Sequence, residues 1–314
     1  MKFHAYNPWM LRGVLYGIAV GAAFTADAAN SPAAKPPVQT TTSAAVKATA
    51  APALPKLSAQ QIVDRNLAAR GGVSAWKAVQ SMTLSGKLDA GRVRKDGGGL
   101  ANNPVQARLE AKARAKLIVE GKYHPESEKI IQLPFTLDLA RPNKQRLEVP
   151  FQGNTAVQVY NGSSGWKLRP YLGRHDVEVY TKDELAIAAN EQALDGPLVD
   201  SAAKGTQVSL VGTDQVEGQP AYHLSLKLKD GSTRGLWIDG KSFLEVRIEG
   251  EPRRRDGRPR AVMTFLADYK KVNGLMIPHL RETRVVGDAH AERIVIEKVV
   301  INPTLPPATF SKPT

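Results

Sequence analysis

The sequence of 314 residues contains no cysteine. Disulfide bonds, thiol nucleophiles, cysteine-ligated zinc and iron–sulfur clusters are therefore excluded, because each requires a sulfur that this chain lacks. The six histidines are scattered and show no paired metal-ligand spacing. Ser163 and Ser164 lie in a turn without the Gly-x-Ser-x-Gly pattern of a nucleophile elbow. We therefore expect no catalytic residue, no metal and no cofactor.

The charge is strongly unbalanced, with 43 Lys and Arg against 30 Asp and Glu, a formal net charge of +13. A surface of this sign attracts anionic membranes and acidic partners. Nucleic acid is not expected as a partner, since aromatic residues are not interleaved with the basic ones and the chain is predicted to be exported. The hydrophobic fraction of 42% is sufficient for a folded core.

The N-terminus has the pattern of an export signal. Lys2 and Arg12 precede the apolar run Gly13–Phe24, and Ala26-Asp27-Ala28 offers small residues for cleavage. The run is shorter than the roughly 20 residues that span a membrane, which favours a cleaved signal peptide over residues 1–28; a retained anchor is the alternative. Residues 29–56 are rich in Pro, Ala and Thr and predict a disordered linker. A periplasmic location follows.

From residue 57 the chain is mostly strand and turn. Ser58 and Gln61, and later Thr181 and Glu184, have capping-box spacing and predict two helices. Period-two alternation elsewhere predicts about ten strands in antiparallel meanders. Asn-Gly and Asp-Gly pairs provide the hairpin turns. An Ala- and Lys-rich stretch near 97–129 interrupts the first two strands as an insertion.

Two helical segments are too few to cover the apolar sides of about ten strands in a flat sheet. The sheet is therefore expected to curl around an apolar hollow, with helices over its concave face. A two-sheet sandwich whose faces fill each other is the alternative, and periodicity alone does not separate the two.

Several short motifs resemble the outer-membrane lipoprotein-sorting (LolA/LolB-like) family. They are Gln61-Ile62-Val63, Arg70-Gly71-Gly72 with Trp76, the run Asp138 to Lys144, Val159 to Trp166, Asp195-Gly196-Pro197-Leu198-Val199-Asp200, and Tyr269 to Pro278. The resemblance covers residues 57–314 apart from the insertion. It implies a mainly β, curved antiparallel half-barrel with helices over the concave face, and acyl chains as ligands.

The expected hollow would be lined by large apolar residues and closed by the segment Thr181–Lys204, and packing in an ordinary core is the alternative for each of these residues. The candidate lining and lid residues are Trp76, Leu133, Phe135, Phe151, Trp166, Leu185, Ile187, Leu194, Leu198, Tyr222, Trp237 and Phe265. Asp195 and Asp200 are interpreted as helix caps, and His279 as a strand-end residue that forms a hydrogen bond. Arg253, Arg254, Arg255, Arg258 and Arg260 form either a solvated hairpin or a patch for anionic partners.

These observations predict a monomeric, non-enzymatic periplasmic carrier of acylated molecules, lipoproteins foremost, that docks on an inner- or outer-membrane partner. An envelope scaffold with a filled β-core is one alternative. A hydrolase of envelope lipids is another, for which no polar residue can be nominated.

Overall fold

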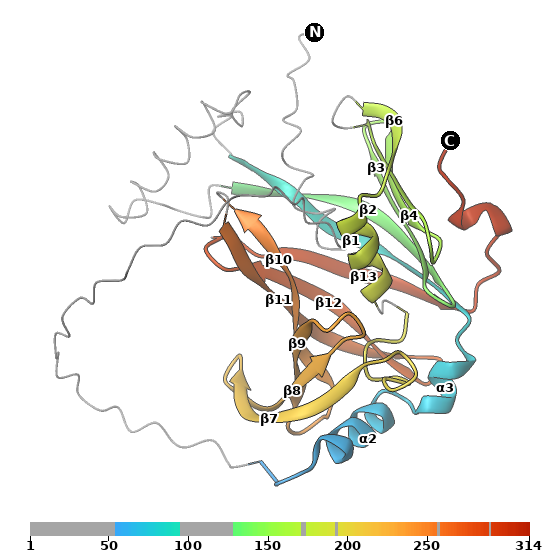
Figure 1. Cartoon of the computed structure of the whole chain (residues 1–314). Coiled ribbons are helices and arrows are strands. Elements are labelled where there is room, and N and C mark those ends of the chain that lie inside the picture. Colours follow the sequence, from blue (N-terminus) through green and yellow to red (C-terminus); the bar gives the residue numbers. More distant parts are fainter. Residues whose placement is uncertain (1–53, 95–127, 171–173, 192–193, 256–257, 289) are drawn as a thin grey trace, which may run out of the picture.

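The computed structural model describes residues 54–94, 128–170, 174–191, 194–255, 258–288 and 290–314. In these ranges a single antiparallel sheet of 13 strands runs in the order β6-β5-β4-β3-β2-β1-β13-β12-β11-β10-β9-β8-β7. The sheet is curved and open, since β6 and β7 form its two edges (Figure 1). The predicted mainly β, antiparallel fold is confirmed. The predicted signal peptide, most of the linker and the insertion lie outside the described residues.

Two meanders make up the sheet, and the first and last strands join them. The strands are β1 (Ser81–Arg94), β2 (Glu128–Ala140), β3 (Lys144–Phe151), β4 (Asn154–Tyr160), β5 (Gly165–Arg169), β6 (Arg174–Val179), β7 (Gln207–Val216), β8 (Gln219–Lys227), β9 (Thr233–Asp239), β10 (Glu245–Arg255), β11 (Arg258–Val272), β12 (Leu275–Val285) and β13 (Glu292–Ile301). β1 pairs with both β2 and β13. The sequence predicted fewer strands because β6 is a largely exposed edge strand with little apolar alternation.

Three α-helices accompany the sheet in the described ranges: α2 (Ala59–Ala69), α3 (Val73–Ala78) and α5 (Lys182–Asn190). Both predicted capping boxes are present, with Ser58 and Gln61 at α2 and with Thr181 and Glu184 at α5. Figure 1 shows α2 and α3 together at one end of the sheet. The domain begins slightly before Leu57, because the Pro55 carbonyl accepts a hydrogen bond from the Tyr222 hydroxyl at 2.9 Å.

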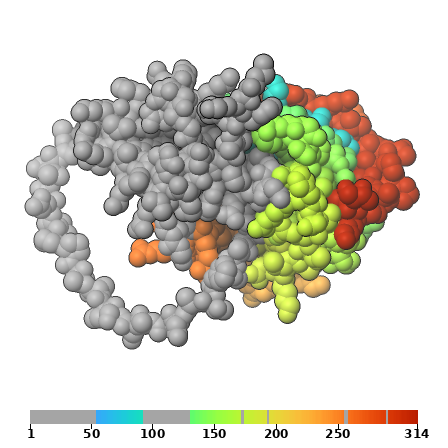
Figure 2. Space-filling view, turned by 90° about the horizontal axis from the view of Figure 1, so that it is seen from above, coloured from blue at the N-terminus to red at the C-terminus, as the bar shows by residue number. Residues whose placement is uncertain are grey.

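The two faces of the sheet carry different side chains. Met82, Leu84 and Leu88 of β1 stand opposite Leu139, Leu137 and Leu133 of β2. All six belong to the largest hydrophobic cluster, which also holds Ile62 of α2 and Trp76 of α3. We call this side the inner face. Smaller clusters occupy the outer face, one of them beneath the C-terminal 3₁₀-helix η4 (Pro307–Phe310). Figure 2 shows this C-terminal segment, in dark red, beside the green strands.

Gly86 marks the joint between the meanders. It lies at an irregularity where β1 pairs with β13, and a Cβ added there would stand 2.0 Å from the Val295 carbonyl oxygen. A contact of this length with a backbone atom is relieved only by moving a strand.

We predict that Gly86→Ala lowers the free energy of unfolding by about 1–3 kcal/mol, because β1 and β13 must separate to admit the methyl group. Urea denaturation measures the loss. Lys87→Ala is the matched control: its side chain is half exposed and forms only a surface pair with Glu297. Equal stability of the two variants would contradict close packing at the joint.

Candidate ligand-binding face of the sheet

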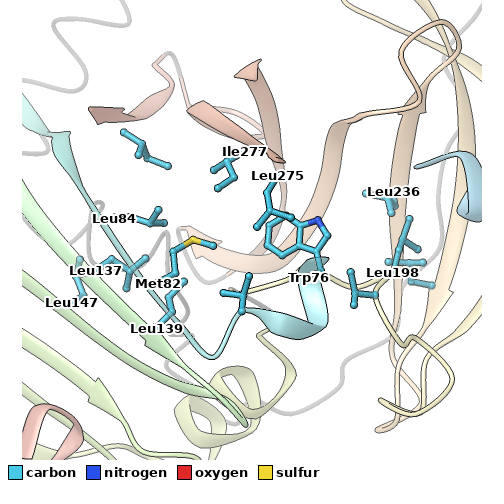
Figure 3. Close-up of a cluster of buried hydrophobic side chains, with 14 of the residues drawn as sticks. Trp76, Met82, Leu84, Leu137, Leu139, Leu147, Leu198, Leu236, Leu275 and Ile277 are labelled. Carbon is cyan, nitrogen blue, oxygen red and sulfur yellow. The ribbon is translucent and has the colours of Figure 1, made fainter. Parts of the chain in front are cut away.

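The inner face is lined with apolar side chains from both meanders. Leu84, Leu137 and Leu147 come from β1–β3, while Leu236 and Ile277 come from β9 and β12. Figure 3 shows these groups facing a common interior, with Trp76 of α3 between them. The Trp76 indole nitrogen donates a 3.1 Å hydrogen bond to the Arg70 carbonyl, so its polar atom is satisfied within the core.

Most of the predicted lining residues lie on this side. Trp76, Leu133, Phe135, Leu198 and Tyr222 belong to the largest cluster, and Phe151 and Leu194 pack against it. Leu185 of α5 packs separately, against Tyr160, Tyr180 and Ala188. Ile187 of the same helix is half-buried.

Three predicted lining residues are on the wrong side of the sheet. Trp166 packs on the outer face with Val159 and Phe310. Trp237 and Phe265 share another outer cluster. The reason is strand register: Trp237 stands opposite His223, and their rings stack at 4.1 Å between centroids. Both faces of these strands carry large apolar residues, so size and hydropathy alone did not indicate the face.

The side chains of the inner face are buried. The inner-face residues Leu84, Leu137 and Ile277 are at most 7% exposed, and Leu88 is 1% exposed. The sequence predicted an open hollow, whereas these side chains pack against one another in a single cluster.

The covering element comprises α5 and residues 194–204, which we call the cover. Its anchor is Asp195, whose side chain is 5% exposed. One carboxylate oxygen accepts from the Arg141 guanidinium at 2.9 Å, and the other from the Lys204 ammonium at 2.5 Å. The Asp195 carbonyl accepts from the Arg70 guanidinium at 2.8 Å. Asp195 thereby connects the cover to the α2–α3 segment and the β2–β3 turn.

Arg70 extends this anchor to the other meander. Its guanidinium lies 3.3 Å from the Glu245 carboxylate of β10 and 4.4 Å from the centre of the Trp76 ring. The Tyr269 hydroxyl donates to the Glu245 carbonyl at 2.8 Å, and burial raises the pKa of Tyr269. Burial also lowers the pKa of Lys204, against the opposing effect of Asp195.

The helix of the cover has polar anchors of its own. Lys167 of β5 and Glu184 of α5 form an ion pair in which both side chains are buried. Asn143 donates to the last carbonyls of α5, those of Ala188 and Ala189, at 3.1 and 3.2 Å. Only Glu184 and Ala188 of this helix are buried, so α5 buries little apolar surface.

The sequence interpretation of Asp195 as a helix cap is wrong. Its carboxylate binds Arg141 and Lys204 instead, because the chain places it between those two cations. Asp200 forms an exposed ion pair with Lys77. The sequence patterns did not identify Arg70, Arg141 and Lys204 as site residues. The available signal was that Arg70, Arg141 and Asp195 each stand beside glycine or proline in the motifs quoted above. His279 does form the expected hydrogen-bond contact, with Nδ1 3.0 Å from the Ile277 carbonyl oxygen.

The arginine-rich hairpin is part of the sheet. β10 continues to Arg255 and β11 begins at Arg258, and only residues 256–257 separate them. Arg253 is not a free cation, since its guanidinium binds both carboxylate oxygens of Glu292 at 2.9 Å. Arg254 and Arg258 are exposed and Arg260 is half-buried.

The part of the chain that the structure describes holds no cluster of side chains suited to a metal ion. Within the same residues, no helix is both long enough and apolar enough to cross a membrane.

Comparison with solved structures finds similar chains at low sequence identity. It is similar to a LolA superfamily protein from Nitrosomonas europaea (12% identity, TM-score 0.48, 82% of this chain and 99% of that one). A DUF1329 family protein from Desulfovibrio piger (13%, 0.47, 81% and 97%) and a Vibrio parahaemolyticus domain described as outer-membrane lipoprotein-sorting (10%, 0.46, 80% and 95%) are also similar. No family model and no curated protein matches. The likeness concerns the fold alone.

We predict that Asp195→Asn lowers the free energy of unfolding by about 2 kcal/mol, because it leaves two cations without their shared carboxylate. Asp200→Asn is the control, since the exposed pair with Lys77 contributes less than about 1 kcal/mol. Urea denaturation of both variants gives the difference. Equal losses would show that Asp195 is no more important to the fold than a surface residue.

Proposed function

We propose that this protein binds acyl chains at the inner face of its sheet and carries acylated molecules, lipoproteins among them, through the periplasm. The observation that carries the proposal is the mismatch between this face and its cover. Apolar side chains line the inner face across both meanders, whereas the cover supplies α5, which has two buried side chains, and the buried Leu198 and Val199. An acyl chain in place of the cover would gain about 0.8 kcal/mol for each buried methylene.

The way in which the cover is attached supports its movement. Its polar contacts with the rest of the domain include the Asp195 anchor, the Lys167–Glu184 pair and the Asn143 hydrogen bonds, and its apolar contacts include those of Leu198 and Val199. Buried ion pairs add little net stability but favour one docked geometry. A cover held in this way has a definite closed position, and its movement withdraws Leu198 and Val199 from the main hydrophobic cluster.

The closed state should limit ligand affinity. When only a fraction of the molecules is open, the apparent dissociation constant rises in inverse proportion to that fraction. Any substitution that loosens the cover without damaging the inner face should therefore strengthen binding.

We predict that the purified protein binds a fluorescent C16 fatty-acyl probe, and that Glu184→Gln lowers the apparent dissociation constant about three- to tenfold. Glutamine preserves the capping box with Thr181 but leaves Lys167 without its buried counter-charge. Asp183→Asn is the control, because this neighbouring acid is exposed. Fluorescence titration measures all three proteins.

Native mass spectrometry of protein isolated from membranes provides an independent test by detecting co-purifying lipid or lipopeptide. Protein that is free of lipid and does not bind the probe would refute the proposal.

We place the protein in the periplasm because of the predicted signal peptide, and we expect a monomer without enzymatic activity. Binding and release through cover movement require no reacting group.

An envelope scaffold is a second candidate, and the closed interior favours it. If the inner face is simply a core, the protein will not bind the probe but will co-precipitate with an envelope complex. Probe titration therefore separates the two candidates directly.

The arginine-rich hairpin is proposed as the surface that meets anionic membranes. Guanidinium groups pair well with phosphate, and Arg254 and Arg258 are exposed near the tip of the hairpin, where Arg254 stands opposite Pro259 and Arg258 opposite Arg255. Arg253 is better excluded from a test, because Glu292 already binds it.

We predict that Arg254→Ser/Arg258→Ser weakens binding to anionic liposomes at low salt by about thirtyfold, because each of the two removed cations costs about 1 kcal/mol near a charged surface. Lys87→Ser/Lys298→Ser is the control, as it removes the same charge from exposed positions in the middle of the sheet. Liposome co-sedimentation gives both affinities. A similar loss in the control would show that only net charge matters.

A further inference from the structure

One arginine lies on the inner face without a counter-charge. Leu275, Ile277, His279, Arg281 and Thr283 alternate along β12 and therefore project to one side of the sheet. Leu275 and Ile277 belong to the main hydrophobic cluster. Arg281 also stands opposite Ile294 of β13, which in turn stands opposite the buried Leu88 of β1. Cross-strand partners share a face, so Arg281 lies on the apolar inner side.

The surroundings of Arg281 do not satisfy its guanidinium. Among the described residues it forms neither a hydrogen bond nor an ion pair. Its neighbour across β11 is Leu266, and the next inward pair, Thr264 and Thr283, share a hydrogen bond with each other. The side chain is half-buried. Arginines in such positions are normally paired, because their five donors lose water on burial.

The charged groups linked to Arg281 through Tyr269 include more cations than carboxylates. The Tyr269 hydroxyl is under the electrostatic influence of both Arg281 and Arg70, and Arg70 contacts Glu245 and the Asp195 carbonyl. Asp195 in turn holds Arg141 and Lys204. This connected group contains four cations and two carboxylates. Arg281, Arg70, Arg141 and Lys204 thus outnumber the two carboxylates, those of Glu245 and Asp195.

We propose that Arg281 is the head-group site of the ligand: it binds the anionic group, a carboxylate or a phosphate, of an acylated molecule whose chain lies along the inner face. The inference rests on the proposed acyl binding and specifies its substrate class. A guanidinium binds either anion through two parallel hydrogen bonds. The strand register places the apolar side chains of Leu88 and Ile294 beside Arg281, next to the attachment point of the chain.

The experiment compares three ligands with the same C16 chain: palmitate, 1-palmitoyl-lysophosphatidic acid and neutral 1-monopalmitoylglycerol. Competition against the fluorescent C16 probe gives the affinity of each. We expect both anions, or one of them, to bind at least about tenfold more tightly than the neutral compound, since a charge-assisted pair in a poorly solvated site contributes this much. Preference for palmitate would identify a carboxylate site, and preference for the lysophospholipid a phosphate site.

Substitutions assign the preference to Arg281. In Arg281→Gln the ratio of anionic to neutral affinity should fall to near one, while Arg281→Lys, which keeps the charge without the planar pair of donors, should retain part of it. Arg284→Gln is the matched control: it removes the same charge from the same strand, where Arg284 is exposed and already paired with Glu217 and Glu282. Circular dichroism and thermal unfolding confirm that each variant is folded.

The outcomes distinguish this inference from the proposed function. Equal affinity for anionic and neutral ligands in the unmodified protein would overturn the head-group site and leave acyl binding intact. The site would also fail if Arg281→Gln and Arg284→Gln changed the ratio equally. Binding of none of the three compounds would overturn the proposed function and the head-group site with it.

Discussion

The arrangement of this domain depends on one buried carboxylate. Asp195 stands where the chain passes from the first meander to the second, and its side chain and carbonyl together bind Arg70, Arg141 and Lys204. Through Arg70 the contact continues to Glu245 in the second meander. Two β-meanders that pair only through β1 and β13 are thereby connected a second time, beneath the cover. The contacts of Asp195 determine where the cover rests. The apolar side chains of the inner face determine what kind of group could take the place of the cover.

Much of the fold could be predicted from the sequence because local signals determine it. The alternation from Met82 to Leu88 and both capping boxes specify strands and helix starts without knowledge of distant residues. β6 was missed because its residues are largely exposed and carry no apolar period. The side occupied by Trp166 or Trp237 depends on pairing with other strands, whose own outward residues are also large.

The candidate site was harder to predict for a related reason. Arg70 is 125 residues from Asp195 and 175 residues from Glu245 in the sequence. Nothing in the local sequence distinguishes a buried partner from a solvated one. Arg281 shows the same limit: it alternates regularly within β12, but its lack of a partner is a property of the neighbouring strands. Apolar patterns therefore indicated the face that is proposed to bind a ligand, whereas the pairing of the polar groups around it became visible only in three dimensions.

The pairing of β1 with β13 determines when the sheet can be completed during folding. Met82 pairs with Ile301, so the central seam of the sheet is made by segments that are more than two hundred residues apart in sequence. During synthesis each meander can form on its own, but both would present a bare central edge until the last strand is available. Such late, long-range pairing slows folding and prolongs the lifetime of aggregation-prone folding intermediates. A chain cut shortly before Glu292 would keep its other strands yet lose the seam, and is expected to aggregate rather than to fold as a smaller domain.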